Sequence, residues 1–397
     1  MMNILFVVIH DGIGGIEQSF SNLIDELSND KNLSIDILYF CKTGNRDMTG
    51  FDHVHVYDEN KRLSIVAKTQ KEVFAMSKGL SLLRLFCGFI CKYISQGLGY
   101  SILMKDISID KKYDIAISYN HSKANSLYGG TNEFVLEHVR ADKKYAFIHG
   151  DLLLANLDSK YSHKIYKKFD KVVCVSKSCK KIFDETWNDL RSKSVVVYNG
   201  VNVRRILMEA GEGFAVNKEV INFITAARLD KVKAIKRTIQ AFKYVKDRGL
   251  INFKWYIVGN GKELDEDIRY SKELGVDDWI VFLGEKKNPF YYMKNMDALL
   301  VLSYQEAAPM VFYEANVLGI PIVSTNTRSA KELVEEKGNG IVCENNLASI
   351  VDTLTRLVKN PDILRRIRRN VVKKVDNRES TDSFYRLLDT AYSDDAT

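Results

Sequence analysis

The sequence lacks the features that mark metal-binding, disulfide-linked and nucleic-acid-binding proteins. No two of its six cysteines have the C-x2-C spacing, and most lie in apolar periodic segments, as small hydrophobic side chains do. We therefore expect reduced thiols in a cytoplasmic protein and no metal site. The net charge of +7, from 58 basic and 51 acidic residues, is too small to indicate nucleic acid. It is compatible with an anionic small ligand or an anionic membrane surface.

Long targeting segments and low-complexity segments are also missing. Residues 4–9 form a short apolar run that is followed at once by a glycine-rich turn, so we expect a first strand there and no signal peptide. At about 150 residues per domain, the 397 residues predict two or three domains, each with its own core.

Short apolar strands alternate with helical patterns along both halves of the chain. This alternation predicts an α/β fold with two Rossmann-like, doubly wound parallel sheets. The polar, glycine-rich stretch at 209–213 indicates a linker. We expect a first domain at 1–203, a linker at 204–218, a second domain at 219–379 and a final helix at 380–397 that returns to the first domain. The expected strands lie at 4–9, 34–40, 114–118, 145–149, 220–226, 254–259, 280–284, 297–302 and 321–324 and within 172–178 and 195–202.

A strand, a tight loop and a helix N-terminus follow one another between residues 297 and 318. Pro309 suits the first helical position, and we expect the helix at Met310–Leu318. The positive N-terminal end of such a helix favours an anion such as phosphate. Glu306 and Glu314 would repel a bound diphosphate unless each binds neutral hydroxyls, which a ribose and a sugar ring supply. The stretch therefore predicts a nucleotide-sugar site; the alternative is an amphipathic helix with two surface glutamates.

Arg228 and Lys233 lie in the loop after the first strand of the second half, at the carboxyl edge of its predicted sheet. The planar fork of arginine and the mobile charge of lysine suit two neighbouring phosphates. The pair therefore predicts a diphosphate site, with a solvated basic loop as the alternative.

Two further candidates follow strands of the first half. Gly15 has no Cβ, so a phosphate could approach the backbone there, although the glycine spacing is not the dinucleotide fingerprint. A plain turn is the alternative. His149 ends the strand at 145–149 beside a glycine, where an open α/β sheet places its ligands.

These motifs resemble, in the same order, those of retaining glycosyltransferases with two Rossmann domains (the GT-B fold), the family 4-like "glycosyl transferases group 1". Residues 306–315, Glu-Ala-Ala-Pro-Met-Val-Phe-Tyr-Glu-Ala, are similar to the family's Glu-x7-Glu motif, but Ala307 and Ala308 replace a glycine and an aromatic residue. Residues 227–234 are similar to its Gly-Arg-Leu-x3-Lys-Gly motif, with alanine at both glycine positions.

The resemblance implies that a hexosyl unit moves from a UDP-linked nucleotide diphosphate-sugar to a glycan or lipid-linked acceptor in surface polysaccharide or glycan assembly. It implies no cofactor and no metal, because Arg228 and Lys233 would neutralise the leaving diphosphate. The implied catalytic residues are His149, Glu306, Arg228 and Lys233. The implied donor-binding residues are Gly15, Arg228, Lys233, Glu306, Ala307, Ala308, Pro309, Met310, Val311 and Glu314.

Two other functions are compatible with the same fold. A non-catalytic subunit that supports a partner transferase is favoured by Ala307 and Ala308, and is opposed by the retained charged residues of both motifs. An epimerase or a phosphorylase fits less well, because the chain has no signature of a pyridoxal-bearing lysine and an epimerase is not expected to carry a Glu-x7-Glu motif.

Residues 61–112 carry ten basic but only three acidic residues. Within them the apolar stretch 80–92 is interrupted by Arg84 and Lys92, which argues against a membrane-spanning helix. One interpretation is a basic amphipathic helix at the inner face of an anionic membrane. The other is a core helix whose basic side chains extend to water.

Overall fold

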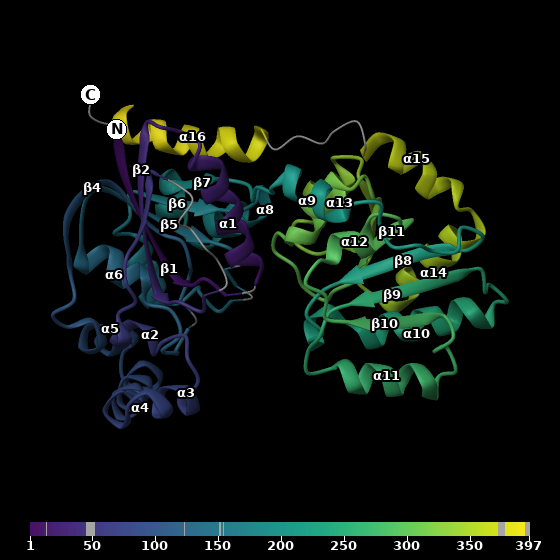
Figure 1. Ribbon diagram of the computed structural model, residues 1–397, viewed down its shortest axis with the longest axis horizontal. Coiled ribbons are helices and arrows are strands. Elements are labelled where there is room, and N and C mark those ends of the chain that lie inside the picture. The colour runs from purple at the N-terminus through teal and green to yellow at the C-terminus, as the bar shows by residue number, and fades with distance from the viewer. Residues whose placement is uncertain are drawn as a thin grey trace. The chain divides into compact units, whose positions relative to one another are not determined.

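The chain divides into two compact units, Met1–Gly200 with Arg378–Thr397 and Val201–Asn377 (Figure 1). Each unit is an α/β sandwich around its own parallel sheet, as the alternating sequence pattern predicts. The computed structural model describes residues 1–12, 14–44, 52–122, 124–150, 152–153, 155–371 and 378–393.

The first unit is built on a seven-stranded sheet in the order β3-β2-β1-β4-β5-β6-β7. β1 (Met2–His10) pairs in parallel with β2 (Leu33–Cys41) on one side and with β4 (Ile109–Ser118) on the other. The strand order therefore reverses at the carboxyl ends of β1 and β4, the place where open α/β sheets bind ligands. The other strands are β3 (Val54–Val56), β5 (Val139–Ile148), β6 (Lys171–Cys174) and β7 (Ser194–Val196).

The core of this unit joins the two ends of the chain. β1 is covered on both faces, which explains why its residues form a continuous apolar run. Phe20 of α1 (Gly15–Leu27) packs in the same core as Phe6, and so do Phe384 and Leu387 of α16 (Arg378–Ser393). The final helix thus completes the first unit. Its other helices are α2 (Lys61–Ser64), α3 (Gln70–Met76), α4 (Lys78–Tyr93), α5 (Gln96–Met104), α6 (Thr131–His138), α7 (Lys160–Tyr166), α8 (Lys177–Thr186) and η1 (Asn188–Lys193).

The second unit is built on a six-stranded parallel sheet in the order β10-β9-β8-β11-β12-β13. Its order reverses between β8 (Ile221–Ala226) and β11 (Ala298–Val301), which are direct neighbours. The other strands are β9 (Phe253–Val258), β10 (Ile280–Gly284), β12 (Ile322–Thr325) and β13 (Gly340–Cys343). Its helices are α9 (Val203–Ala210), η2 (Lys231–Lys233), α10 (Ile235–Asp247), α11 (Leu264–Glu273), α12 (Pro289–Met293), α13 (Met310–Val317), η3 (Lys331–Glu335), α14 (Leu347–Lys359) and α15 (Asp362–Val371).

The predicted fold class, two Rossmann-like parallel sheets, is confirmed. The stretch expected as a linker, 204–218, contains most of α9 and belongs to the second unit. Asn202 caps this helix by accepting a hydrogen bond from the Arg205 amide, and Ile206 and Ala210 are buried as α9 packs on α12 and α13. The sequence did not predict this helix, because two apolar residues one helical turn apart are a weak helical pattern in a polar, glycine-rich stretch.

Candidate functional site

The candidate site of the second unit lies at the carboxyl ends of β8 and β11. Because these strands are neighbours, the loops that follow them, 227–234 and 302–309, meet at one edge of the sheet. They enclose a small cavity of about 20 Å³, whose lining includes Ala227, Lys233 and Glu306. The structure thus brings the residues of the two predicted motifs together.

Lys233 and Glu306 form an ion pair in this cavity. The Lys233 Nζ lies 2.7 Å from the Glu306 Oε1, and the Ser303 hydroxyl donates to the same oxygen at 2.8 Å. The Glu306 side chain is only 10% exposed and that of Lys233 24%, so the pair is largely shielded from water. A bound anion would therefore compete with Glu306 for the lysine. Ser303 was not identified as a site residue from the sequence.

The backbone of loop 227–234 holds Lys233 in place. The Lys233 amide donates to the Asp230 carbonyl at 3.0 Å, and the next residue, Ala234, is buried in the left-handed region with φ of 55°. The family's motif has a glycine at this position. A residue with a Cβ adopts the left-handed conformation at a conformational cost of about 1–2 kcal/mol. On the other side of the loop, a Cβ at Gly259 would lie 1.8 Å from the Ala227 carbonyl oxygen. Only glycine lets the loop after β9 lie so close.

Arg228 does not enter the cavity. Its side chain is 82% exposed, and its Nε lies 3.2 Å from the Asp230 Oδ2 in the same loop. The structure places Arg228 and Lys233 on one loop, as the sequence predicts, but only Lys233 points towards Glu306. That both contact one diphosphate stays a prediction.

The N-terminus of α13 is open to an anion. Pro309 is the N-cap and not the first helical residue, because its ψ of 129° is extended. The helix begins at Met310, as expected, and ends at Val317, one residue before the expected end. Among the described residues, no side chain caps it. As at any helix start, the first-turn amides of Met310 and Val311 have no acceptor within the helix. Ala307 and Ala308, which precede the helix, are half-buried.

Glu314 lies about 6 Å further along α13, one helical turn past Met310. Burial raises the pKa of its carboxyl to about 7, and the nearby charge of Arg205 opposes this shift only in part. Arg205 belongs to α9 and was not identified from the sequence, because nothing in the stretch 203–210 marks it as a neighbour of the Glu-x7-Glu motif. Among the described residues, Arg205 is the charged side chain that affects the pKa of this carboxyl.

His149 in the first unit follows β5, at the carboxyl edge of the sheet. Its ring centroid lies 4.6 Å from that of Tyr119 and 5.6 Å from that of Phe147. Burial, together with the neighbouring His121, lowers its pKa to about 3, so the imidazole is neutral near pH 7. The Nε2 is buried and has no hydrogen-bond partner among the described residues. It can therefore bond a ligand hydroxyl.

Gly15 begins α1 at the switch point of the first sheet. The preceding residue, Gly14, is the N-cap, and a Cβ there would lie 2.2 Å from the Glu17 Oε2. Gly14 itself has no side chain that could cap this helix. Gly15 is thus placed at a helix N-terminus, where a phosphate could approach its backbone.

In the described part of the chain, no three His, Cys, Asp or Glu residues are grouped so that they could hold a metal ion. No helix there is long and apolar enough to cross a membrane.

Residues 209–374, nearly all of the second unit, match the family model described as "Glycosyl transferases group 1". Among curated relatives, N-acetyl-alpha-D-glucosaminyl L-malate synthase of Bacillus anthracis is 23% identical over 203 residues, 50% of this chain and 53% of that protein. A 4-alpha-N-acetylgalactosaminyltransferase of Campylobacter jejuni, which acts on an undecaprenol-linked acceptor by its name, is 26% identical over 211 residues, 53% of this chain and 56% of that protein. The chain spans about half the length of these relatives.

Solved structures match over the full chain. Anabaena HepE in complex with UDP is 17% identical, and the match covers 99% of this chain and 100% of the HepE chain with a TM-score of 0.66. The lipopolysaccharide outer core galactosyltransferase WaaB is also 17% identical, with 97% and 99% covered and a TM-score of 0.61. At these identities the likeness shows the fold alone. The chain therefore has the GT-B fold, and its residues 209–374 are similar to the glycosyl transferases group 1 family.

Proposed function

We propose that this protein is a retaining glycosyltransferase that moves a hexosyl unit from a UDP-linked sugar to a sugar or lipid-linked acceptor. The observation that carries the proposal is the Lys233–Glu306 pair beside the uncapped N-terminus of α13, inside the segment that matches the family. The names of relatives support the acceptor class, since they include a capsular polysaccharide glycosyltransferase of Staphylococcus aureus and the Campylobacter enzyme. HepE in complex with UDP supports the nucleotide.

The charges of the site suit departure of a nucleoside diphosphate. When the bond from the anomeric carbon to the phosphate oxygen breaks, negative charge develops on the phosphate. The α13 amides and Lys233 would stabilise it from fixed positions, with Arg228 swinging in from solvent. Lys233 would leave Glu306 for the phosphate. The freed carboxylate can then accept hydrogen bonds from sugar hydroxyls and offset the positive charge at the anomeric carbon.

The remaining assignments concern the nucleoside and the sugar. Glu314 in its ionised form can accept hydrogen bonds from both ribose hydroxyls. His149 is neutral, and its Nε2 has no partner in the part of the chain that the structure describes, so it can bond a hydroxyl of the transferred sugar. Neither assignment requires a metal or a cofactor.

A non-catalytic subunit of the same fold is the second candidate, and the observation in its favour is Ala307 with Ala308 at the start of the donor loop. The shielded ion pair between Lys233 and Glu306 opposes it. A protein that only supports a partner has no need to keep a buried carboxylate and lysine at the same sheet edge.

A panel of labelled sugar nucleotides tests the proposal. We expect one UDP-sugar to be consumed by the purified protein with lipid and glycan acceptors, and NMR to show that the product keeps the anomeric configuration of the donor. A Glu306→Ala variant serves as the inactive control. An inverted product contradicts the retaining mechanism. Tight UDP binding without turnover of any donor, in the wild type as in the control, would favour the non-catalytic subunit.

Donor affinity should depend on pH through Glu314. Its carboxyl has a pKa of about 7, so the neutral acid predominates below this pH and the carboxylate above it. The carboxylate is the better acceptor for ribose hydroxyls, so we expect UDP affinity to fall as the pH drops from 8 to 6. Below the pKa the fall should reach up to about tenfold per pH unit. Isothermal titration calorimetry measures this. Glu314→Gln should bind weakly at every pH, and a wild-type slope that persists in this variant would assign the titration to another group.

A further inference from the structure

Helix α4 of the first unit has an apolar face that nothing in the described structure covers. Leu82, Phe86, Phe89 and Tyr93 follow one another at intervals of three or four residues, and Leu85 lies three residues from Leu82 and four from Phe89. All five therefore lie on one side of the helix. Their exposed fractions are 68%, 56%, 56%, 56% and 65%. Five large apolar side chains in a row are more than the scattered exposure that a protein surface ordinarily shows.

The opposite face of α4 is already buried in the unit. Ser81, Cys87, Ile90 and Cys91 are covered, and α4 packs on α3 and α5. A Cβ at Gly99 of α5 would lie 2.3 Å from the Cys91 sulfur, so the two helices approach closely. The core-helix interpretation of the sequence thus accounts for one face of α4. The second apolar face needs another explanation.

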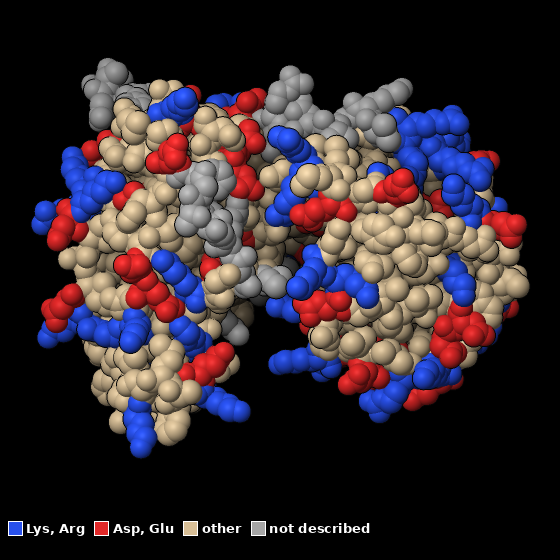
Figure 2. All heavy atoms as spheres, viewed as in Figure 1, with Lys and Arg blue, Asp and Glu red and all other residues tan. Residues whose placement is uncertain are grey.

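A neighbouring side chain extends this face into a patch, which we call the α4 patch. Phe74 of α3, which lines one groove together with Leu82 and Leu85, is 58% exposed. A groove with a volume of about 610 Å³ runs between α3 and α4, lined mainly by Phe74, Leu82 and Leu85 with Lys71 and Lys78. In the view of Figure 2, the surface over these helices, at the lower left, is mostly uncharged, with charged side chains towards its edge.

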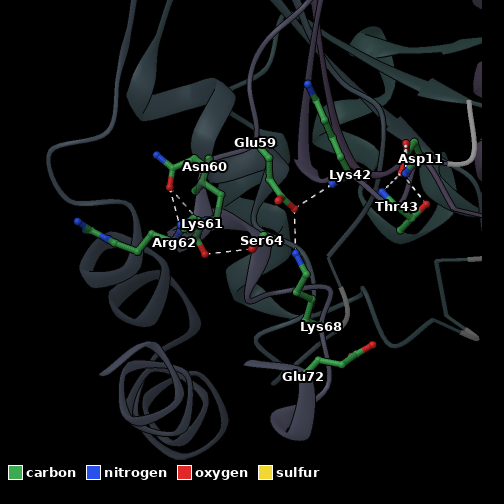
Figure 3. A network of polar contacts seen from close by, with 12 residues as sticks. Asp11, Lys42, Thr43, Glu59, Asn60, Lys61, Arg62, Ser64, Lys68 and Glu72 are labelled. Atoms are coloured by element: carbon green, nitrogen blue, oxygen red, sulfur yellow. Dashed lines mark hydrogen bonds and ion pairs between the residues drawn. The ribbon is translucent and has the colours of Figure 1, made fainter. Parts of the chain in front are cut away.

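Six of the ten basic residues of 61–112 fall into two groups. The first group points inward and holds the segment of α2–α5 together and to Glu59, which precedes it. The Lys68 Nζ lies 2.9 Å from the Glu59 carboxylate, which also accepts from the Lys42 amide (Figure 3). The Arg62 Nε donates to the Leu103 carbonyl at 2.7 Å, and Arg84 donates to the Ile65 carbonyl. These charges are not available to a partner.

The second group, Lys71, Lys78 and Lys92, is exposed around the α4 patch. The nearest acidic residue in these helices is Glu72, whose carboxylate accepts from the Thr69 amide at 2.6 Å and the Thr69 hydroxyl at 2.7 Å. The patch is therefore apolar at its centre and positive at its rim. A lipid bilayer with an apolar interior and negatively charged head groups is complementary to this arrangement.

We propose that the α4 patch docks on an anionic lipid bilayer, with α4 lying in the plane of the membrane surface. Its 16 residues make a helix of about 24 Å, and its buried face keeps it attached to the unit. A second copy of this chain fits less well, because it would bring the lysines of two rims together. The inference rests on exposed side chains and holds whichever donor or acceptor the protein uses.

Cosedimentation of the full chain with vesicles tests this docking. We expect binding to vesicles of phosphatidylglycerol and phosphatidylcholine at low salt, with weaker binding as salt rises. The pair Lys78→Ala and Lys92→Ala should lower the affinity by about fivefold per lysine. The pair Leu85→Ser and Phe89→Ser should lower it by at least about tenfold at every salt concentration. Matched controls in the second unit are Ile251→Ser with Tyr244→Ser, also exposed, which should bind as the wild type does.

Three results would overturn the proposal. They are no binding to anionic vesicles at low salt, equal binding to pure phosphatidylcholine vesicles, and undiminished binding of the Leu85→Ser and Phe89→Ser pair. A concentration-dependent dimer that this pair abolishes, without any lipid binding, would assign the patch to a second copy. All substituted side chains are exposed, so circular dichroism melting should show native folding in every variant.

Discussion

Glu306→Gln should lower turnover by roughly 10²–10³-fold, the effect of losing one preorganised charge contact with the transition state, while UDP-sugar affinity stays equal or improves. The variant keeps the shape of the side chain and can still accept from Ser303. It removes the charge that offsets the developing cation at the anomeric carbon. It also removes the competitor for Lys233, which sits 2.7 Å away in the free protein, so the lysine becomes available to the diphosphate.

Steady-state kinetics and calorimetry with the UDP-sugar measure the two effects separately. Ser303→Ala is the matched control, because it removes a neutral hydrogen bond to the same oxygen and leaves the charge. We expect this variant to raise the activation free energy of transfer by about 0.5–1.5 kcal/mol, much less than Glu306→Gln does. An undiminished turnover in Glu306→Gln, or an equal fall in turnover and affinity, would reduce Glu306 to a residue that positions Lys233.

Lys233→Ala should weaken UDP-sugar binding by about 1.5–3 kcal/mol, the worth of a charge-assisted hydrogen bond, and slow transfer as well. The side chain lies on a loop fixed by the left-handed Ala234, so no neighbouring lysine can take its place without rebuilding the loop. The variant also leaves the shielded Glu306 without its counter-charge beside the phosphate. Arg228→Ala should have the smaller effect, because its side chain is exposed and must order on binding.

Lys231→Ala is the control for net charge, since it removes an exposed lysine from the same loop. EDTA should leave the wild-type rate nearly unchanged. A strict need for a divalent cation, or equal losses in Lys231→Ala and Lys233→Ala, would contradict the assignment of leaving-group stabilisation to Lys233. A double-mutant cycle with Glu306→Gln should show strong non-additivity, because the two side chains are in contact.

The sequence predicted the two sheets well because buried parallel strands are continuous apolar runs. It failed where strands are very short, as at β3 (Val54–Val56), or include glycine, as at β13 (Gly340–Cys343). It also assigned Lys233 and Glu306 to one donor site, since both follow strands of one sheet, but it did not predict the ion pair between them.

Other features of the site depend on packing that a linear pattern does not contain. The charge of Arg205 acts on Glu314 because α9 packs on α13, although the two residues are far apart in sequence. The neutral state of His149 follows from burial against Tyr119 and Phe147. In α4, apolar residues occur on both sides of the helix, so the sequence could not show which side is covered.

The place of α16 in the first core also has a consequence for the order in which the protein is made. β7 ends at Val196, but Phe384, Leu387 and Leu388 come from α16, about 180 residues later. At about 5–20 residues per second, the ribosome would need roughly 10–35 s for this interval. During this time the first sheet is complete but one part of its core is open to water. The nascent chain therefore passes through a stage at which the first unit exposes apolar surface, and a chaperone that shields such surface would act on it then.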